Sequence, residues 1–131
     1  MVAMLMPAMR NILLCSSDPL LVKSLTNVLR DEGFIVVTVE HPALAIQRVM
    51  GGRYGMMIVD SEPFGLSAED AVRIIRSLMP DFPVLYVGSA EHSPLPAVET
   101  PIDLEKFKRT VHSIAIQDGS MPEGPGIFAA K

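Results

Sequence analysis

The chain has 131 residues, of which 49% are apolar and 20% charged, as in a typical single soluble globular domain. These proportions exclude a wholly disordered chain, a collagen and a small disulfide-stabilised protein. The 11 basic and 15 acidic side chains sum to a net charge of −4, and no block of like charges occurs. We therefore expect no nucleic acid and no membrane surface among its partners.

The single cysteine, Cys15, cannot form an internal disulfide bond, which favours a reducing compartment. Residues 1–9 are apolar but too few to span a bilayer, and they lack the basic segment of a secretory signal. We therefore expect a cytoplasmic protein with an N-terminal extension over 1–10 and a folded domain over 11–116. The remaining residues, 117–131, are rich in Gly and Pro without periodicity, which predicts a flexible tail.

From residue 12 onward, short apolar runs alternate with longer stretches of helical periodicity, which predicts strands and helices in turn. The predicted strands are 12–15, 35–39, 56–59 and 84–87, with a short one at 97–98. Asp18 and Pro19 are suited to cap and open the first helix, which Gly33 ends. The second and third helices open at Pro42 and Ala68. A last helix follows Pro101 and presents Leu104, Phe107, Val111 and Ile114 on one face.

The connection after the fourth strand breaks this pattern. Residues 88–96 contain Pro94 and Pro96, lack helical periodicity, and are fewer than the dozen or so that a parallel crossover needs. We expect that the fourth helix is missing and that only a loop covers this edge of the sheet. The alternation as a whole predicts an α/β fold, a flavodoxin-like doubly wound sheet of five parallel strands.

Function in such a sheet belongs at the carboxyl ends of the strands. The polar and small residues there are Ser16, Ser17, Asp18, Asp60, Ser61, Glu62, Gly88, Ser89 and Thr100. Asp18, Asp60 and Glu62 could together form an acidic site for Mg²⁺, a cation that prefers carboxylate oxygens. The residues alone leave another interpretation open, in which Asp60 caps a loop, Asp18 caps the first helix and Glu62 is solvated.

Five segments in the same order carry a resemblance to a known family. They are ILLCSSDPL at 12–20, EGFIV at 32–36, MIVD at 57–60, PVLYVGSA at 83–90 and TPIDLE at 100–105. On these segments the chain over 11–116 resembles the receiver domain of response regulators in two-component systems, the CheY-like family. The resemblance implies that Asp60 is the phosphoacceptor, that Ser89 and Thr100 are switch positions, and that the Thr100–Pro101 peptide is cis. It also implies a histidine kinase or a downstream regulator as partner, and no enzyme activity.

The chain departs from the family at positions that carry charge. Ser16 and Ser17 stand where the family has an acidic pair that binds Mg²⁺, and Thr100 replaces a lysine. Gly88 or Ser89 stands at the hydroxyl position, and Ala97 replaces an aromatic switch residue. Phosphoryl transfer to a carboxylate depends on such charges, because they neutralise the transferring oxygens.

We therefore expect a stand-alone degenerate receiver that serves phosphorelay-type signalling as a protein-interaction module, independently of phosphorylation. It would use no cofactor, or Mg²⁺ weakly, and its partner would bind at the first or last helix. The alternative is a working receiver that is phosphorylated on Asp60 with Mg²⁺. The sequence leaves the oligomeric state open.

Other chemistries of this fold lack their residues. A flavin or nucleotide site would need glycines after the first strand, where Asp18 instead puts a negative charge. A low-molecular-weight phosphatase would need an arginine six residues after Cys15, and Leu21 stands there. The histidines are scattered without metal-ligand spacing, at His41, His92 and His112.

Overall fold

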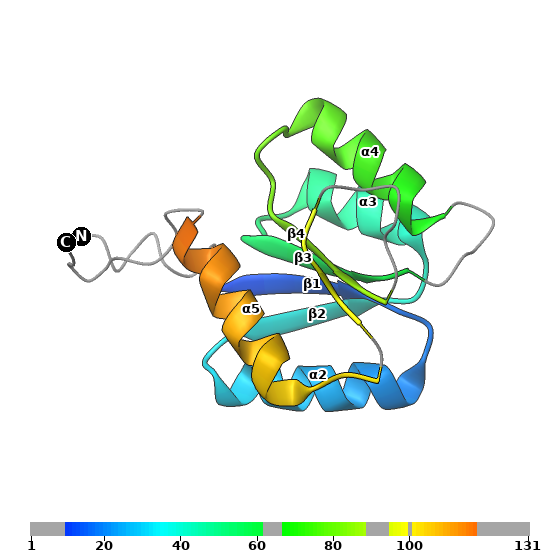
Figure 1. Ribbon diagram of the computed structural model, residues 1–131. Coiled ribbons are helices and arrows are strands. Elements are labelled where there is room, and N and C mark those ends of the chain that lie inside the picture. Colours follow the sequence, from blue (N-terminus) through cyan, green and yellow to red (C-terminus); the bar gives the residue numbers. More distant parts are fainter. Residues whose placement is uncertain (1–9, 62–66, 89–94, 100, 118–131) are drawn as a thin grey trace.

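The computed structural model of the protein describes residues 10–61, 67–88, 95–99 and 101–117. Five parallel strands form one sheet in the order β2-β1-β3-β4-β5 (Figure 1). The strands are β1 (Asn11–Cys15), β2 (Ile35–Val39), β3 (Met56–Asp60), β4 (Val84–Val87) and β5 (Ala97–Val98). The helices are α2 (Pro19–Asp31), α3 (Pro42–Gly51), α4 (Ala68–Leu78) and α5 (Leu104–Gln117). The predicted flavodoxin-like doubly wound sheet is thereby confirmed.

Helix α2 begins and ends as its sequence predicts. The Asp18 carboxylate accepts hydrogen bonds from the backbone N–H groups of Leu20 and Leu21, and Pro19 occupies the first turn. At the other end Gly33 has φ +94°, a left-handed conformation that glycine adopts without a Cβ penalty. The chain then turns directly into β2.

Two apolar cores lie on the two faces of the sheet, because alternate residues of each strand point to opposite sides. On one face, Ile12 and Leu14 of β1 pack in a cluster that includes Leu25 of α2 and Phe107 of α5. The opposite face has its own cluster, which contains Leu13, Cys15, Ala45 and Ile75. Figure 1 shows this division, with α2 and α5 on one side of the sheet and α3 and α4 on the other. The strands are therefore buried on both faces, as their continuous apolar runs indicate.

The register of the central strands brings their carboxyl ends together. Cys15 pairs with Val59, and Asp60 pairs with Val87. The sequence predicts that this strand ends at residue 59, but in the structure β3 also includes Asp60. The pairing continues because the backbone N–H of Ser61 donates a further hydrogen bond to the carbonyl of Val87 (2.9 Å). The side chains that follow β1, β3 and β4 consequently meet at one edge of the sheet.

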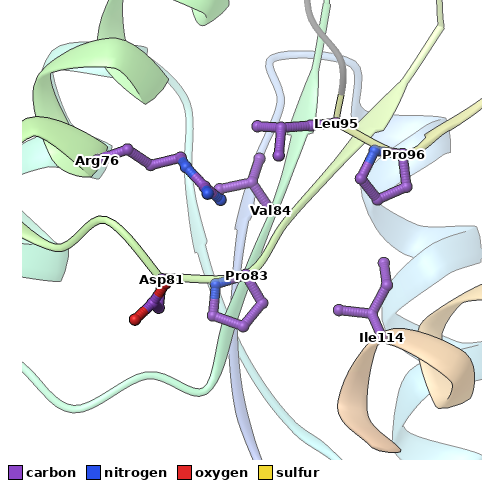
Figure 2. A pocket seen from close by; sticks show the side chains of 7 residues that line it. All are labelled: Arg76, Asp81, Pro83, Val84, Leu95, Pro96 and Ile114. Atoms are coloured by element: carbon purple, nitrogen blue, oxygen red, sulfur yellow. The ribbon is translucent and has the colours of Figure 1, made fainter. Parts of the chain in front are cut away.

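The connection between β4 and β5 is short. It runs over residues 88–96, of which the structure describes Gly88, Leu95 and Pro96, none of them helical. Whether a helix is missing depends on residues 89–94, which lie outside the described part of the chain. Between the described elements there is a groove of about 440 Å³ (Figure 2). Its lining residues are Arg76, Asp81, Pro83, Val84, Leu95, Pro96 and Ile114.

Arg76 forms one wall of this groove. Its guanidinium donates a hydrogen bond to the backbone carbonyl of Phe82 (2.8 Å), which ties the end of α4 to the loop before β4. Leu95 packs against the apolar cluster beneath α3 and α4. The groove thus lies where α4 and α5 flank the amino ends of β4 and β5.

Candidate functional site

Asp60 is held by a neutral hydroxyl. Ser16 follows β1 and is almost fully buried, with 2% of its surface exposed. Its Oγ donates a hydrogen bond to Oδ2 of the half-buried Asp60 (3.0 Å) and accepts one from the backbone N–H of Asp18 (3.1 Å). The Ser16 hydroxyl therefore links the end of β1, the end of β3 and the start of α2.

Asp18 acts as a helix cap. Its Oδ1 accepts from the N–H of Leu20 at 3.0 Å and from that of Leu21 at 3.4 Å, and the residue is exposed. A carboxylate in this place stabilises the N-terminus of α2, where N–H groups have no partner within the helix. Of the two roles that the sequence left open for Asp18, the structure shows the cap.

The structure describes only part of the predicted Mg²⁺ site. Within residues 10–61, 67–88, 95–99 and 101–117, no group of three or more His, Cys, Asp or Glu side chains is placed to hold a metal ion. Glu62, the third member of the predicted acidic site, lies outside these residues, so that site stays a prediction. At the strand ends, Asp60 contributes a carboxylate, whereas Ser16 directs its hydroxyl proton toward that carboxylate. Mg²⁺ in proteins prefers carboxylate oxygens, and a hydroxyl used in this way is a poor substitute.

The Cys15 thiol interacts electrostatically with Asp60 but is a poor nucleophile. Burial raises the pKa of this thiol to about 12, and the negative charge of Asp60 adds to the increase. A thiolate is the nucleophilic form, so Cys15 serves as a small buried apolar residue.

The first residue after β4 is a glycine, Gly88, and so has no hydroxyl. Gly88, one of the two residues assigned to the hydroxyl position, has φ +102° and donates its N–H to the carbonyl of Val98 (2.8 Å). The other candidate, Ser89, and the second switch position, Thr100, lie outside the described residues, as does the Thr100–Pro101 peptide. Sequence reasoning gave no role to Ser61, although this residue lies beside Gly88. The sequence signal that could have indicated a role for Ser61 is its position directly after Asp60.

An apolar groove of about 330 Å³ opens beside this site, between the start of α2 and the start of α5. Leu20 of α2 is 77% exposed there, and Leu104 of α5 is 40% exposed. The full lining is Asp18, Leu20, Leu21, Ser24, Leu25, Pro101, Ile102 and Leu104. A leucine as exposed as Leu20 keeps its apolar surface in water, a cost that binding to another protein would remove.

The described part of the chain contains no helix with the length and apolar character needed to cross a membrane. The longest described helix, α5, has 14 residues.

Comparison with known proteins supports the fold rather than the chemistry. No protein-family model and no curated protein matches the sequence. Solved structures do match, and most of those compared are described as receiver domains or response regulators. The response regulator TrrA of Thermotoga maritima, solved with Mg²⁺ and BeF, is 23% identical with a TM-score of 0.72, over 79% of this chain and 97% of that one.

Two further neighbours agree with it. A response regulator receiver protein of Sinorhizobium medicae is 22% identical with a TM-score of 0.75, over 82% of this chain and 95% of its own. The chemotaxis protein CheY4 of Vibrio cholerae is 15% identical with a TM-score of 0.72, over 79% and 97%. The chain therefore has the fold of response regulator receiver domains, and the resemblance drawn from its sequence segments is confirmed at this level.

Proposed function

We propose that this chain is a degenerate receiver domain that acts in signal transduction by binding a protein partner without phosphorylation of Asp60. The observation that carries the proposal is the Ser16 hydroxyl, buried and bonded to Asp60 at 3.0 Å where the family resemblance puts an acidic pair. The proposed partner is a histidine kinase or a downstream regulator, and the proposed location is the cytoplasm.

Two missing charges support the proposal that Asp60 is not phosphorylated. A transferring phosphoryl group spreads negative charge over its oxygens, and catalysis depends on cations that neutralise it. Ser16 cannot supply the anionic ligand that would hold Mg²⁺ beside Asp60, and Thr100 replaces the second cation. Loss of one such electrostatic contact commonly costs roughly two to three powers of ten in rate. With two lost, transfer to Asp60 becomes too slow to carry a signal.

The partner would bind at the apolar groove between α2 and α5. Of the residues that line this groove, Leu25 belongs to the packed core of the α2 and α5 face, and Leu21 packs against that core. Leu20 and Leu104 offer the exposed apolar surface, and Asp18 places a carboxylate at its rim. We expect a partner surface with apolar side chains at its centre and a basic residue opposite Asp18.

A working receiver that is phosphorylated on Asp60 is the second candidate. The likeness to TrrA, a response regulator solved in complex with Mg²⁺ and BeF, favours it. The position of Asp60 at the carboxyl end of β3, half-buried and next to the end of β1, is also suitable for an acceptor carboxylate.

A phosphorylation assay separates the two candidates. The protein and its D60N variant are incubated with Mg²⁺ and acetyl phosphate, and the intact masses are then compared. We expect neither protein to gain the mass of a phosphoryl group. A gain by the wild-type protein that D60N does not show would replace the proposal with the working receiver.

The docking surface is tested with purified histidine-kinase dimerisation domains and response regulators of the same cell, by biolayer interferometry. L20S removes the most exposed leucine of the groove, and Leu44→Ser, in an exposed leucine of α3, is the matched control. A partner that binds wild-type and L44S equally but loses at least tenfold in affinity for L20S supports the groove. Equal binding by all three proteins places the interface elsewhere.

A further inference from the structure

The carboxyl ends of β3, β4 and β5 are joined by consecutive backbone hydrogen bonds. The N–H of Ser61 donates to the carbonyl of Val87 at 2.9 Å, and the N–H of Gly88 donates to the carbonyl of Val98 at 2.8 Å. Ser61 directly follows Asp60, and Gly88 directly follows β4. A movement of either residue would therefore break a hydrogen bond between strands next to the candidate site.

Only one side chain fits between these two strand ends. A Cβ built on Gly88 would come within 3.0 Å of Oγ of Ser61, closer than Cβ atoms come to other atoms in proteins. Cβ of Ser61 would be 3.6 Å away, an ordinary contact, so the conflict involves the hydroxyl alone. Gly88 also has φ +102°, which L side chains rarely adopt.

We infer that Ser61 and Gly88 form an exclusive pair, in which the Ser61 hydroxyl fills the space of the absent side chain at position 88 and holds the strand ends beside Asp60 in one conformation. The hydroxyl at this point of the site is thereby supplied by the residue that follows β3 instead of a residue that follows β4. It stands on the residue after Asp60, whose backbone is bonded to β4, so it cannot move independently of the sheet.

The pair rests on the proposed function and gives it a physical basis. A switch needs two conformations of one element whose populations a signal can shift. A glycine that admits no side chain and a serine that fills its space leave this edge with a single packing arrangement. The strand ends would then present the same shape to a partner in all states of Asp60.

A double-mutant cycle tests the pair. The four proteins are wild type, S61A, G88A and S61A/G88A, and the equilibrium constant for unfolding is measured in urea by circular dichroism. S61A removes the conflicting Oγ but keeps the Cβ, whose contact with an alanine at position 88 is ordinary. We expect G88A to raise the unfolding constant about tenfold more with Ser61 present than with alanine at that position.

Gly33 supplies the matched control. It has φ +94°, and a Cβ built on it meets nothing within 4 Å. G33A therefore reports the cost of a side chain on left-handed backbone alone, and its effect should be the same with and without S61A.

Every outcome decides the inference. A G88A protein that folds only together with S61A supports the pair as fully as the expected coupling. Additive effects within about twofold overturn it, since contacting residues couple more strongly than that. If G88A unfolds in both backgrounds, the backbone alone excludes a side chain, and the pair is again overturned. The cycle uses no phosphodonor, so its failure leaves the proposed function standing, while phosphorylation of Asp60 would refute that function and leave the cycle unaffected.

Discussion

Replacement of Ser16 by alanine should destabilise the protein well beyond the loss of an ordinary surface hydroxyl. The Ser16 hydroxyl is buried and makes two hydrogen bonds, one to the Asp60 carboxylate at 3.0 Å and one from the N–H of Asp18 at 3.1 Å. A hydrogen bond to a charged group contributes about 1.5–3 kcal/mol, and one between neutral groups about 1 kcal/mol. Asp60 is half-buried, so water can replace part of the first bond.

We therefore expect S16A to lower the free energy of unfolding by about 1.5–3 kcal/mol. Out of the roughly 5–15 kcal/mol that a domain has in total, this is a large loss. The assay is urea denaturation followed by far-ultraviolet circular dichroism, because the chain has no Trp to report by fluorescence. The slope with urea concentration should stay constant, since the surface exposed on unfolding is unchanged.

Ser17→Ala is the matched control for S16A. Ser17 is the next residue in the chain, but it is exposed, and its substitution should change stability by less than about 0.5 kcal/mol. If S16A and S17A proved equally stable, the Ser16–Asp60 hydrogen bond would contribute nothing in solution. The explanation of the site by a neutral hydroxyl would then be refuted.

Three further predictions concern charge and burial. S16D puts a second carboxylate beside Asp60, so it should be less stable than S16A without metal and should regain stability when millimolar Mg²⁺ is added to the urea titration. E32Q should change how the melting temperature falls at acidic pH. A hydrogen bond from His112 (2.8 Å) holds the pKa of Glu32 below its ordinary value. The charged Glu32 side chain therefore stabilises the protein at pH values above its ordinary pKa, and this stabilisation is lost as the pH falls through the lowered pKa. If wild type and E32Q lost stability in parallel down to about pH 3, this contact would not contribute. The Cys15 thiol, whose pKa is about 12, should not react with a disulfide reagent at about pH 8 until urea unfolds the protein, and rapid reaction in buffer would contradict its burial.

The fold was predictable because each element carries a local physical signal. A short run such as 12–15, apolar at every position, fits a strand buried on both faces, and the structure places it in the interior of the sheet. Asp18 followed by Pro19 predicts a helix start with a specific hydrogen-bond pattern, and the carboxylate makes those bonds. Such signals depend on neighbours within a few residues, so the sequence contains them directly.

The candidate site was predictable only in part. A strand end followed by polar residues predicts Asp60 at the functional edge, and the structure agrees. The direction of the Ser16 hydroxyl and the contact between Ser61 and Gly88 depend on side-chain rotamers and on the register of strands far apart in the chain. No local pattern encodes these, because the same residues in another rotamer would leave the strands unchanged.

Taken together, the described features of the site bear on different requirements of a phosphorylation switch. Ser16 concerns the charge that would hold a metal, and the Ser61–Gly88 pair concerns the freedom of the strand ends to move. These requirements are physically independent, so restoring one does not restore the other. An S16D protein that binds Mg²⁺ would thus still have strand ends fixed beside Asp60. If the proposed function holds, a partner would bind through contacts that need no switch, and the groove between α2 and α5 offers apolar surface for them.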